Sequence, residues 1–258
     1  MPKKHSADDR NFDPLSQRFK RNIYDSPKGQ IRLAILRRDF NELLPLKGRS
    51  VLDLGAGQGQ FAKFMLEQGA EVTLIDHSAE MLEQARSLLG TESFFDRTSF
   101  LHSDLWRTEN WPKCFDVITC HAVLEWLEEP FEAIRLMSNK LPPGGYLSLM
   151  FYNLDGLIYK NLLRGNYKKV INEDYRGQRG SLTPNSPLKV SDVLKVAKDE
   201  GLEILCHSGV RCFYDYIFDR NLQTQNIEQA IELELMLSRE PPYRDLGRYV
   251  HLLLRKGQ

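Results

Sequence analysis

Closely spaced glycines after a short apolar segment could bring the backbone against a ligand. The glycines lie in Gly55-Ala56-Gly57-Gln58-Gly59, and Asp53 precedes them within the apolar segment 51–54. Glycine permits a sharp turn and a close approach to a ligand that side chains would exclude. Gln60 stands where the dinucleotide-binding pattern G-x-G-x-x-G has its third glycine. The turn therefore predicts a cofactor site and disfavours a dinucleotide.

A second acidic residue, Asp76, ends the apolar segment 71–76, about 20 residues beyond the turn. A carboxylate at this distance suits ribose hydroxyls, but dinucleotide enzymes use the same device, so Asp76 alone does not distinguish the cofactors. Asp76 could also only cap the helix expected over 81–89, although Ser78 is the better placed N-cap. Together, the turn and the acid resemble the cofactor motifs of the class I S-adenosylmethionine-dependent methyltransferases.

Two further segments should meet the glycine turn, because ligands of open α/β sheets bind beyond the carboxyl ends of the strands. Asp104 follows a strand expected at 100–101. It could accept a hydrogen bond from an adenine amino group, unless it only terminates that strand. The backbone of Leu105 and Trp106 would then contact the ring. His121 follows the strand expected over 115–120 and would lie near the sulfonium.

Strand and helix patterns alternate along most of the chain, which implies a mostly parallel sheet with helices on both faces. A strand over 202–210, an excursion and a terminal strand over 248–254 suit the antiparallel edge hairpin of a seven-stranded methyltransferase sheet. The expected fold is therefore α/β and Rossmann-like. The remaining strands are expected at 51–54, 72–75, 100–101, 115–120 and 146–152, and helices at 61–67, 81–89, 131–141, 154–163, 190–200 and around 227–237.

Two segments are expected outside this core. Helical patterns over 11–24 and 28–44 predict an N-terminal helical cap over residues 1–45, ahead of a cofactor-binding domain over 46–258. Residues 155–189 predict a basic insert or lid, with seven Lys and Arg against three Asp and Glu. Residues 1–40 carry ten Lys and Arg against five Asp and Glu, although the net charge of the whole chain is zero. This uneven charge suits an RNA-facing surface, and it also occurs on ordinary solvated surfaces.

Composition limits the remaining classes. The 258 residues, 41% hydrophobic, suffice for one α/β domain with an insertion. No apolar run approaches the roughly 20 residues that span a bilayer, and the N-terminus lacks a signal-peptide core, so we expect a cytoplasmic protein without membrane contact. The four cysteines form no C-x-x-C pair and no zinc spacing, which predicts reduced thiols and no metal.

More specific motifs are spread along nearly the whole chain. They are Arg10-Asn11-Phe12-Asp13, Arg21-Asn22-Ile23-Tyr24, Lys28-Gly29-Gln30 with Arg32, His121-Ala122-Val123-Leu124-Glu125-Trp126, Leu147-Ser148-Leu149-Met150-Phe151-Tyr152-Asn153, Gly209-Val210-Arg211 with Asp215-Tyr216, and Leu246-Gly247-Arg248-Tyr249 with His251. With these motifs the chain resembles the bacterial tRNA 5-carboxymethoxyuridine methyltransferases. The resemblance implies S-adenosylmethionine as cofactor and the tRNA anticodon stem-loop as partner. It also implies that the carboxylate of 5-carboxymethoxyuridine at the wobble position is converted to its methyl ester.

The resemblance also implies particular contacts. Carried over by position, the cofactor contacts are Arg32, Gly55, Ala56, Asp76, Leu105, Trp106 and His121, to which the turn and the third strand add Gly57 and Asp104. Arg32 would pair with the methionine carboxylate of the cofactor through two hydrogen bonds. A substrate carboxylate is already an anion at neutral pH and needs no general base, so we assign no catalytic residue.

Candidate substrate contacts follow from charge. Tyr152, Arg211 and His251 could donate to the substrate carboxylate, and Lys168 and Lys169 could contact anticodon phosphates. A small-molecule carboxylate or hydroxyl O-methyltransferase would explain the same pocket, without a reason for the basic segments. A nicotinamide-dependent oxidoreductase and a non-enzymatic scaffold are more distant alternatives.

Overall fold

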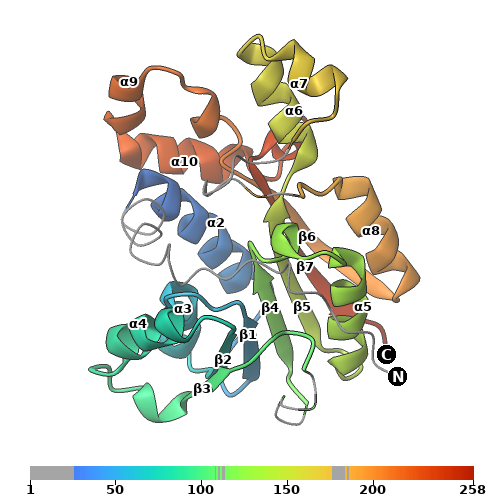
Figure 1. The fold of residues 1–258 in the computed structure, drawn as a ribbon. Helices are drawn as coiled ribbons and strands as arrows, with labels where there is room; N and C mark the ends of the chain where they lie inside the picture. The colour runs from blue at the N-terminus through green and yellow to red at the C-terminus, as the bar shows by residue number, and fades with distance from the viewer. Residues whose placement is uncertain (1–25, 108, 110, 112–113, 176–183, 185) are drawn as a thin grey trace.

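Seven strands form a single sheet in the computed structural model, which describes residues 26–107, 109, 111, 114–175, 184 and 186–258 (Figure 1). The strands are β1 (Ser50–Leu54), β2 (Glu71–Asp76), β3 (Thr98–His102), β4 (Val117–His121), β5 (Tyr146–Tyr152), β6 (Leu202–Val210) and β7 (Tyr249–Lys256). Their order is β3-β2-β1-β4-β5-β7-β6. Strands β1 to β5 run parallel, and β7 is antiparallel to β5 and β6. The expected seven-stranded sheet with an antiparallel edge hairpin is confirmed.

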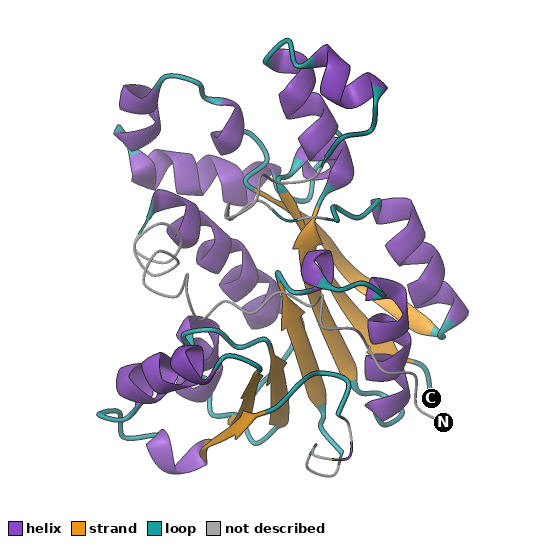
Figure 2. Cartoon of the chain, viewed as in Figure 1, coloured by secondary structure: helices purple, strands orange, loops and turns teal. Residues whose placement is uncertain are grey.

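Helices cover both faces of this sheet (Figure 2). They are α2 (Pro27–Leu43), α3 (Gln60–Glu67), α4 (Ala79–Leu89), α5 (Pro130–Lys140), α6 (Leu154–Leu163), α7 (Tyr167–Ile171), α8 (Val190–Asp199), α9 (Arg220–Thr224) and α10 (Ile227–Leu237). The segment expected as a loop between α6 and α8 contains the short helix α7. The helix expected over 11–24 lies outside the described residues.

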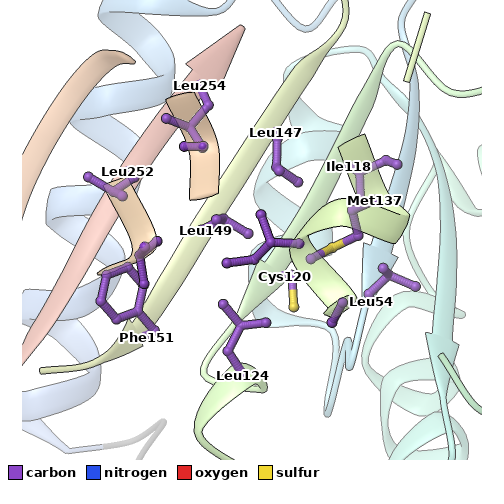
Figure 3. Packing of buried hydrophobic residues seen from close by; sticks show 14 of the residues in the cluster. Leu54, Ile118, Cys120, Leu124, Met137, Leu147, Leu149, Phe151, Leu252 and Leu254 are labelled. Atoms are coloured by element: carbon purple, nitrogen blue, oxygen red, sulfur yellow. The ribbon is translucent and has the colours of Figure 1, made fainter. Parts of the chain in front are cut away.

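Two apolar clusters, one on each face, hold the helices to the sheet. On one face, Phe40 of α2 and Met65 of α3 pack with the side chains of β1 and β2. On the other face, Met137 of α5 packs with Leu147 and Leu149 of β5 (Figure 3). These side chains are almost completely buried. In the described part of the chain, the sheet is therefore the middle of three layers.

The strand register brings the predicted site segments together. Leu54 at the end of β1 pairs with Ile75 of β2 on one side and with Cys120 of β4 on the other. The sheet order reverses between β1 and β4, and such a reversal opens a crevice at the carboxyl ends of the strands. The glycine turn after β1 therefore lies between the ends of β2 and β4.

Four helices extend beyond the main layers at one end of the molecule. Figure 1 shows α6 and α7 together at the top and α9 and α10 beside them. Helix α10 packs against α2. Within the part of the chain that the structure describes, no helix has both the length and the apolar character needed to cross a membrane.

Candidate active site

The glycine turn has a backbone that only glycine adopts easily. Gly55, Gly57 and Gly59 have φ angles of +65°, +55° and +78°. A Cβ atom on Gly55 would lie 2.3 Å from Cγ2 of Val123, in the segment after β4. The turn is held to β2 because the Gly55 N–H donates to the Ile75 carbonyl at 2.8 Å. Glycine at position 55 is therefore required for the close packing of Val123 against the turn.

Asp76 is bound to this turn directly. One oxygen of its carboxylate accepts a hydrogen bond from the Gly57 N–H at 2.9 Å, and the other accepts from the Ser78 N–H at 2.9 Å. Ser78 is the N-cap of α4, as expected, and its hydroxyl accepts from the Met81 N–H. Asp76 thus joins the glycine turn to the start of α4, and its contact with ribose hydroxyls stays a prediction.

A small, open pocket lies beside the turn. Four of the predicted cofactor contacts line it, namely Arg32, Gly55, Ala56 and His121. Five further lining residues were not predicted as contacts: Leu33, Leu36, Asp53, Gln60 and Phe61. The pocket thus joins helix α2, the glycine turn and the end of β4.

The predicted adenine segment lies next to Asp76 but makes local contacts of its own. The Ser103 N–H donates to the Asp76 carbonyl at 3.2 Å, which fixes the segment beside the end of β2. The Asp104 carboxylate accepts a hydrogen bond from the Trp106 N–H at 2.8 Å and so closes a tight turn. Leu105 and Trp106 pack at the margin of the apolar core. Contact of these residues with adenine stays a prediction.

Charges in the pocket are arranged around Arg32. Burial, together with the charge of Asp76, raises the pKa of Asp53 to about 7, while the hydroxyl of Thr119 and the charge of Arg32 act in the opposite direction. Burial lowers the pKa of His121 well below its usual value, and the charges of His251 and Arg32 lower it further. His121 is therefore neutral at physiological pH and does not repel a positively charged ligand.

A buried chain of hydrogen bonds runs from His121 through the sheet. His121 Nε2 lies 2.8 Å from the Ser148 hydroxyl, which lies 2.9 Å from His251 Nε2. His251 Nδ1 lies 2.7 Å from the Asp39 carboxylate of α2. Asp39 also accepts hydrogen bonds from Arg38 and from Arg239. The chain couples the pocket to the packing of α2 on the sheet.

The charge state of His251 sets the direction of these hydrogen bonds. Burial disfavours its charged form, but the hydrogen bond and charge of Asp39 outweigh burial and raise the pKa of His251 to about 9. Protonated His251 donates to both Asp39 and Ser148, so the Ser148 hydroxyl donates to Nε2 of His121. Neutral His121 then carries its proton on Nδ1, which is buried and has no partner among the described residues.

The structure corrects the expectation for His251 as a substrate contact. Its side chain is completely buried, and both ring nitrogens are engaged by Ser148 and Asp39. We therefore reassign His251 as a residue that positions His121. Asp39, Cys206 and His251 also bring three potential metal ligands within 4.8 Å of one another, but the carboxylate of that group is already bound by two arginines.

The other predicted substrate contacts occupy two places. Tyr152 ends β5 with its side chain buried, and Arg211 follows β6 with its guanidinium 3.3 Å from the Asp215 carboxylate. Lys168 and Lys169 are exposed on α7, well away from the sheet in Figure 1. The structure therefore separates the buried Tyr152 and half-buried Arg211 from the exposed lysine pair.

One buried acid and one buried thiol complete the surroundings. Burial raises the pKa of Glu125, which follows β4, to about 8, and neither of its carboxylate oxygens has a hydrogen-bond partner among the described residues. Burial raises the pKa of the Cys120 thiol, so it stays protonated and is a poor nucleophile. The sequence marked Glu125 only as part of a longer motif, and no local pattern indicates its burial.

The residues present fit an adenosyl cofactor with a methionine tail. Gly55 and Ala56 of the turn line the pocket together with Arg32, and Asp76 holds the same turn through the Gly57 N–H. A cofactor with a sulfonium would meet a neutral His121. These residues suit a cofactor that carries a carboxylate for Arg32 and a sulfonium beside His121.

Replacing Arg32 by alanine should weaken cofactor binding by about 10- to 100-fold, because a charge-assisted pair with the methionine carboxylate is lost. Calorimetry with S-adenosylmethionine measures the effect. Arg37→Ala is the matched control, since Arg37 lies on the exposed side of the same helix. A variant that binds the cofactor normally but loses affinity for the methyl acceptor would place Arg32 at the acceptor instead.

Comparisons with known proteins agree with this geometry. A family model for a methyltransferase domain matches residues 52–149. The chain is 38% identical over 256 residues to the tRNA 5-carboxymethoxyuridine methyltransferase of Escherichia coli K12, with 97% of each chain covered. It is 31% identical over 149 residues to a ubiquinone biosynthesis O-methyltransferase of Vibrio cholerae, covering 57% of this chain and 60% of that one.

A solved structure shares the fold at low sequence identity. It is the magnesium protoporphyrin IX methyltransferase of Synechocystis with bound SAH, with a TM-score of 0.65, 17% identity, and coverage of 95% of this chain and 96% of that one. This likeness concerns the fold alone.

Proposed function

Because the chain belongs to the tRNA 5-carboxymethoxyuridine methyltransferase family, we propose that it methylates the carboxylate of 5-carboxymethoxyuridine at the wobble position of tRNA. S-adenosylmethionine is the cofactor, and the product is the methyl ester. The choice of acceptor is supported by the 38% identity to the Escherichia coli enzyme over nearly the full length of both chains. The pocket between Arg32, the glycine turn and His121 supports the cofactor.

The residues around the pocket suit a reaction without proton transfer. When bound, S-adenosylmethionine supplies an electrophilic methyl group on a positively charged sulfur. An acceptor carboxylate aligned with this methyl group would supply the lone pair for the new O–C bond, and the electron pair of the broken C–S bond would stay on sulfur. Both charges disappear, so no base is required. The task of the protein is to align the two groups, which can supply about 7 to 11 kcal/mol of the barrier.

Neutral His121 and buried Glu125 support this mechanism. A neutral imidazole does not repel the positively charged sulfonium. Glu125, whose pKa is raised to about 8 by burial, is protonated at neutral pH and does not repel an incoming carboxylate. We assign neither residue a covalent or proton-transfer role.

The basic, exposed surface of α6 and α7 is proposed to hold the anticodon stem-loop. Lys168 and Lys169 are consecutive in α7 and lie between the exposed side chains of Tyr167 and Ile171 in the sequence. Lysines neutralise phosphates and aromatic rings can stack on unpaired bases, a combination common in RNA-binding surfaces. A tRNA acceptor also agrees with the expected cytoplasmic location, which stays a prediction.

Charge reversal at Lys168 and Lys169 together should raise the Michaelis constant for tRNA by about tenfold and reduce its salt dependence, because two phosphate contacts are lost. Initial rates at several salt concentrations measure both effects. Lys195 and Lys198, exposed on α8, provide a control pair with the same change of charge. Equal effects of the two double variants would remove α7 from the RNA-binding surface.

The choice of acceptor is tested by offering purified protein labelled S-adenosylmethionine with either tRNA or small carboxylates. We expect label in tRNA that carries 5-carboxymethoxyuridine, none in tRNA whose wobble uridine lacks the carboxymethyl group, and none in the small acids. Transfer to small carboxylates or hydroxyls with no transfer to tRNA would identify a small-molecule O-methyltransferase.

A further inference from the structure

Four cationic side chains from separate parts of the chain surround one buried carboxylate, that of Asp215. We call Lys28, Lys160, Arg211 and Arg248 the cationic cluster. Lys28 Nζ and Lys160 Nζ lie 3.6 and 3.7 Å from one Asp215 oxygen, and Arg211 Nε lies 3.3 Å from the other. Arg248 acts on Asp215 through its charge. The Asp215 side chain is only 4% exposed.

The cationic cluster has more positive charge than Asp215 can balance. Burial opposes ionisation of Asp215, but Arg211, Lys160, Arg248 and Lys28 outweigh it and lower its pKa to about 2. Lys160 of α6 shows this excess of positive charge. Burial lowers its pKa to about 8, Asp215 acts in the opposite direction, and the neighbouring cations lower the pKa further. One anion among four cations leaves a half-buried region that a second anion would stabilise.

Two hydrogen-bond donors in this region are also unused. The Tyr152 hydroxyl and Nη1 of Arg248 are buried and have no hydrogen-bond partner among the described residues. The Arg248 guanidinium lies 4.4 Å from the centre of the Tyr152 ring, and Arg211 lies 5.2 Å from the centre of the Tyr249 ring. The two rings contact each other edge to face at 5.4 Å. Stacking thus holds both arginines in place before any ligand binds.

This region lies on the same edge of the sheet as the cofactor pocket. Tyr152 ends β5, and Met150 of β5 pairs with His121, which lines the pocket at the end of β4. The backbone of residues 186–188 joins the two regions, because the Ser186 N–H donates to the Glu125 carbonyl at 3.2 Å and the Leu188 N–H donates to the Tyr152 carbonyl at 2.9 Å. An oxyanion held by the cationic cluster would therefore approach the pocket from the β5 side.

We propose that Tyr152, Arg211 and Arg248 form a subsite for the acceptor carboxylate, with Lys28 and Lys160 supplying further positive charge. The proposal rests on the proposed function and deepens it, because the subsite would select a carboxylate-bearing uridine over a neutral one. Asp215 orients the cations and prevents them from repelling one another. A phosphate of the RNA backbone has the same oxyanion chemistry, and the experiment separates the two sources.

The test measures tRNA affinity with S-adenosylhomocysteine present, so that no methyl transfer occurs. Two tRNA probes are compared, one with 5-carboxymethoxyuridine and one with 5-hydroxyuridine at the wobble position. For Arg248→Gln we expect a loss of about 10- to 100-fold on the first probe and less than roughly twofold on the second. Tyr152→Phe, which removes only the unused hydroxyl and keeps the stacked ring, should shift affinity in the same direction by a smaller factor.

Arg255→Gln is the matched control. Arg255 stacks on Tyr146 at the opposite end of the same pair of strands, so its replacement removes a similar contact far from the proposed subsite. Equal losses of affinity on both probes would assign the cationic cluster to a phosphate and overturn the proposal. Unchanged affinity of Arg248→Gln and Tyr152→Phe for the first probe would also overturn it. Failure of the wild-type protein to methylate the first probe would instead overturn the proposed function.

Discussion

Replacing Asp76 by alanine should reduce the affinity for S-adenosylmethionine by at least about 100-fold. The carboxylate is expected to accept both ribose hydroxyls, and hydrogen bonds to a charged group are each worth about 1.5 to 3 kcal/mol. The structure adds a second cause, because the same carboxylate holds the Gly57 N–H of the cofactor turn. Calorimetric titration of the variant with S-adenosylmethionine measures the loss.

Asp76→Asn separates these two causes. Its amide oxygen can still accept from the Gly57 N–H, while the negative charge and part of the accepting capacity are gone. An affinity loss in Asp76→Asn with an unchanged thermal unfolding midpoint would assign the effect to the ligand contact. Normal affinity in both variants would remove Asp76 from the cofactor site.

Replacing His251 by alanine should lower the free energy of unfolding by about 3 to 5 kcal/mol, the usual cost of breaking a buried ion pair by removing one partner. The ring is completely buried, and its loss leaves the Asp39 carboxylate without the hydrogen bond at 2.7 Å. Chemical denaturation measures the change. His102→Ala is the control, because His102 is exposed and its ring contacts a backbone carbonyl at the surface; its effect should stay within about 0.5 kcal/mol.

The pH dependence of stability gives the same pair an independent signature. The folded pKa of His251 is raised from 6.5 to about 9, so its stabilising contribution is complete below pH 6.5 and is lost as pH rises through about 9. Asp39, whose folded pKa is lowered, loses its contribution only as pH falls below its usual range. Asp53 and Glu125, with pKa values raised to about 7 and about 8, also titrate between pH 6.5 and 9. The quantity to follow is therefore the difference in the free energy of unfolding between the wild type and His251→Ala at each pH. A difference that stays constant from pH 6 to about 9 would contradict the assigned charge state.

The parts of the fold that the sequence predicts depend on local patterns. The apolar runs before Gly55 and through Asp76 are strands because both faces of a parallel sheet are covered, and the positive φ angles require glycine in the turn. Strand β4 begins at Val117, later than expected, because the Asp116 carboxylate accepts hydrogen bonds from both the N–H and the hydroxyl of Ser50. Such side-chain contacts end a strand without changing its hydrophobic pattern.

The parts that could not be predicted depend on residues far apart in the chain. His251 and Asp39 are separated by 212 positions, and neither has a neighbour in sequence that indicates their pairing. For the same reason the sequence presents His251 as a possible donor, whereas the fold buries it. The grouping of Lys28, Lys160 and Asp215 likewise arises only when α2 and α6 meet the end of the sheet.

The most direct test of the account is nucleoside analysis of tRNA after incubation with the purified protein and S-adenosylmethionine. The tRNA should come from cells that lack this activity and should contain 5-carboxymethoxyuridine before the reaction. We predict that this nucleoside disappears and that its methyl ester, which mild alkali converts back to the acid, appears in equal amount. Unchanged 5-carboxymethoxyuridine, with cofactor binding confirmed in the same preparation, would contradict the proposed function.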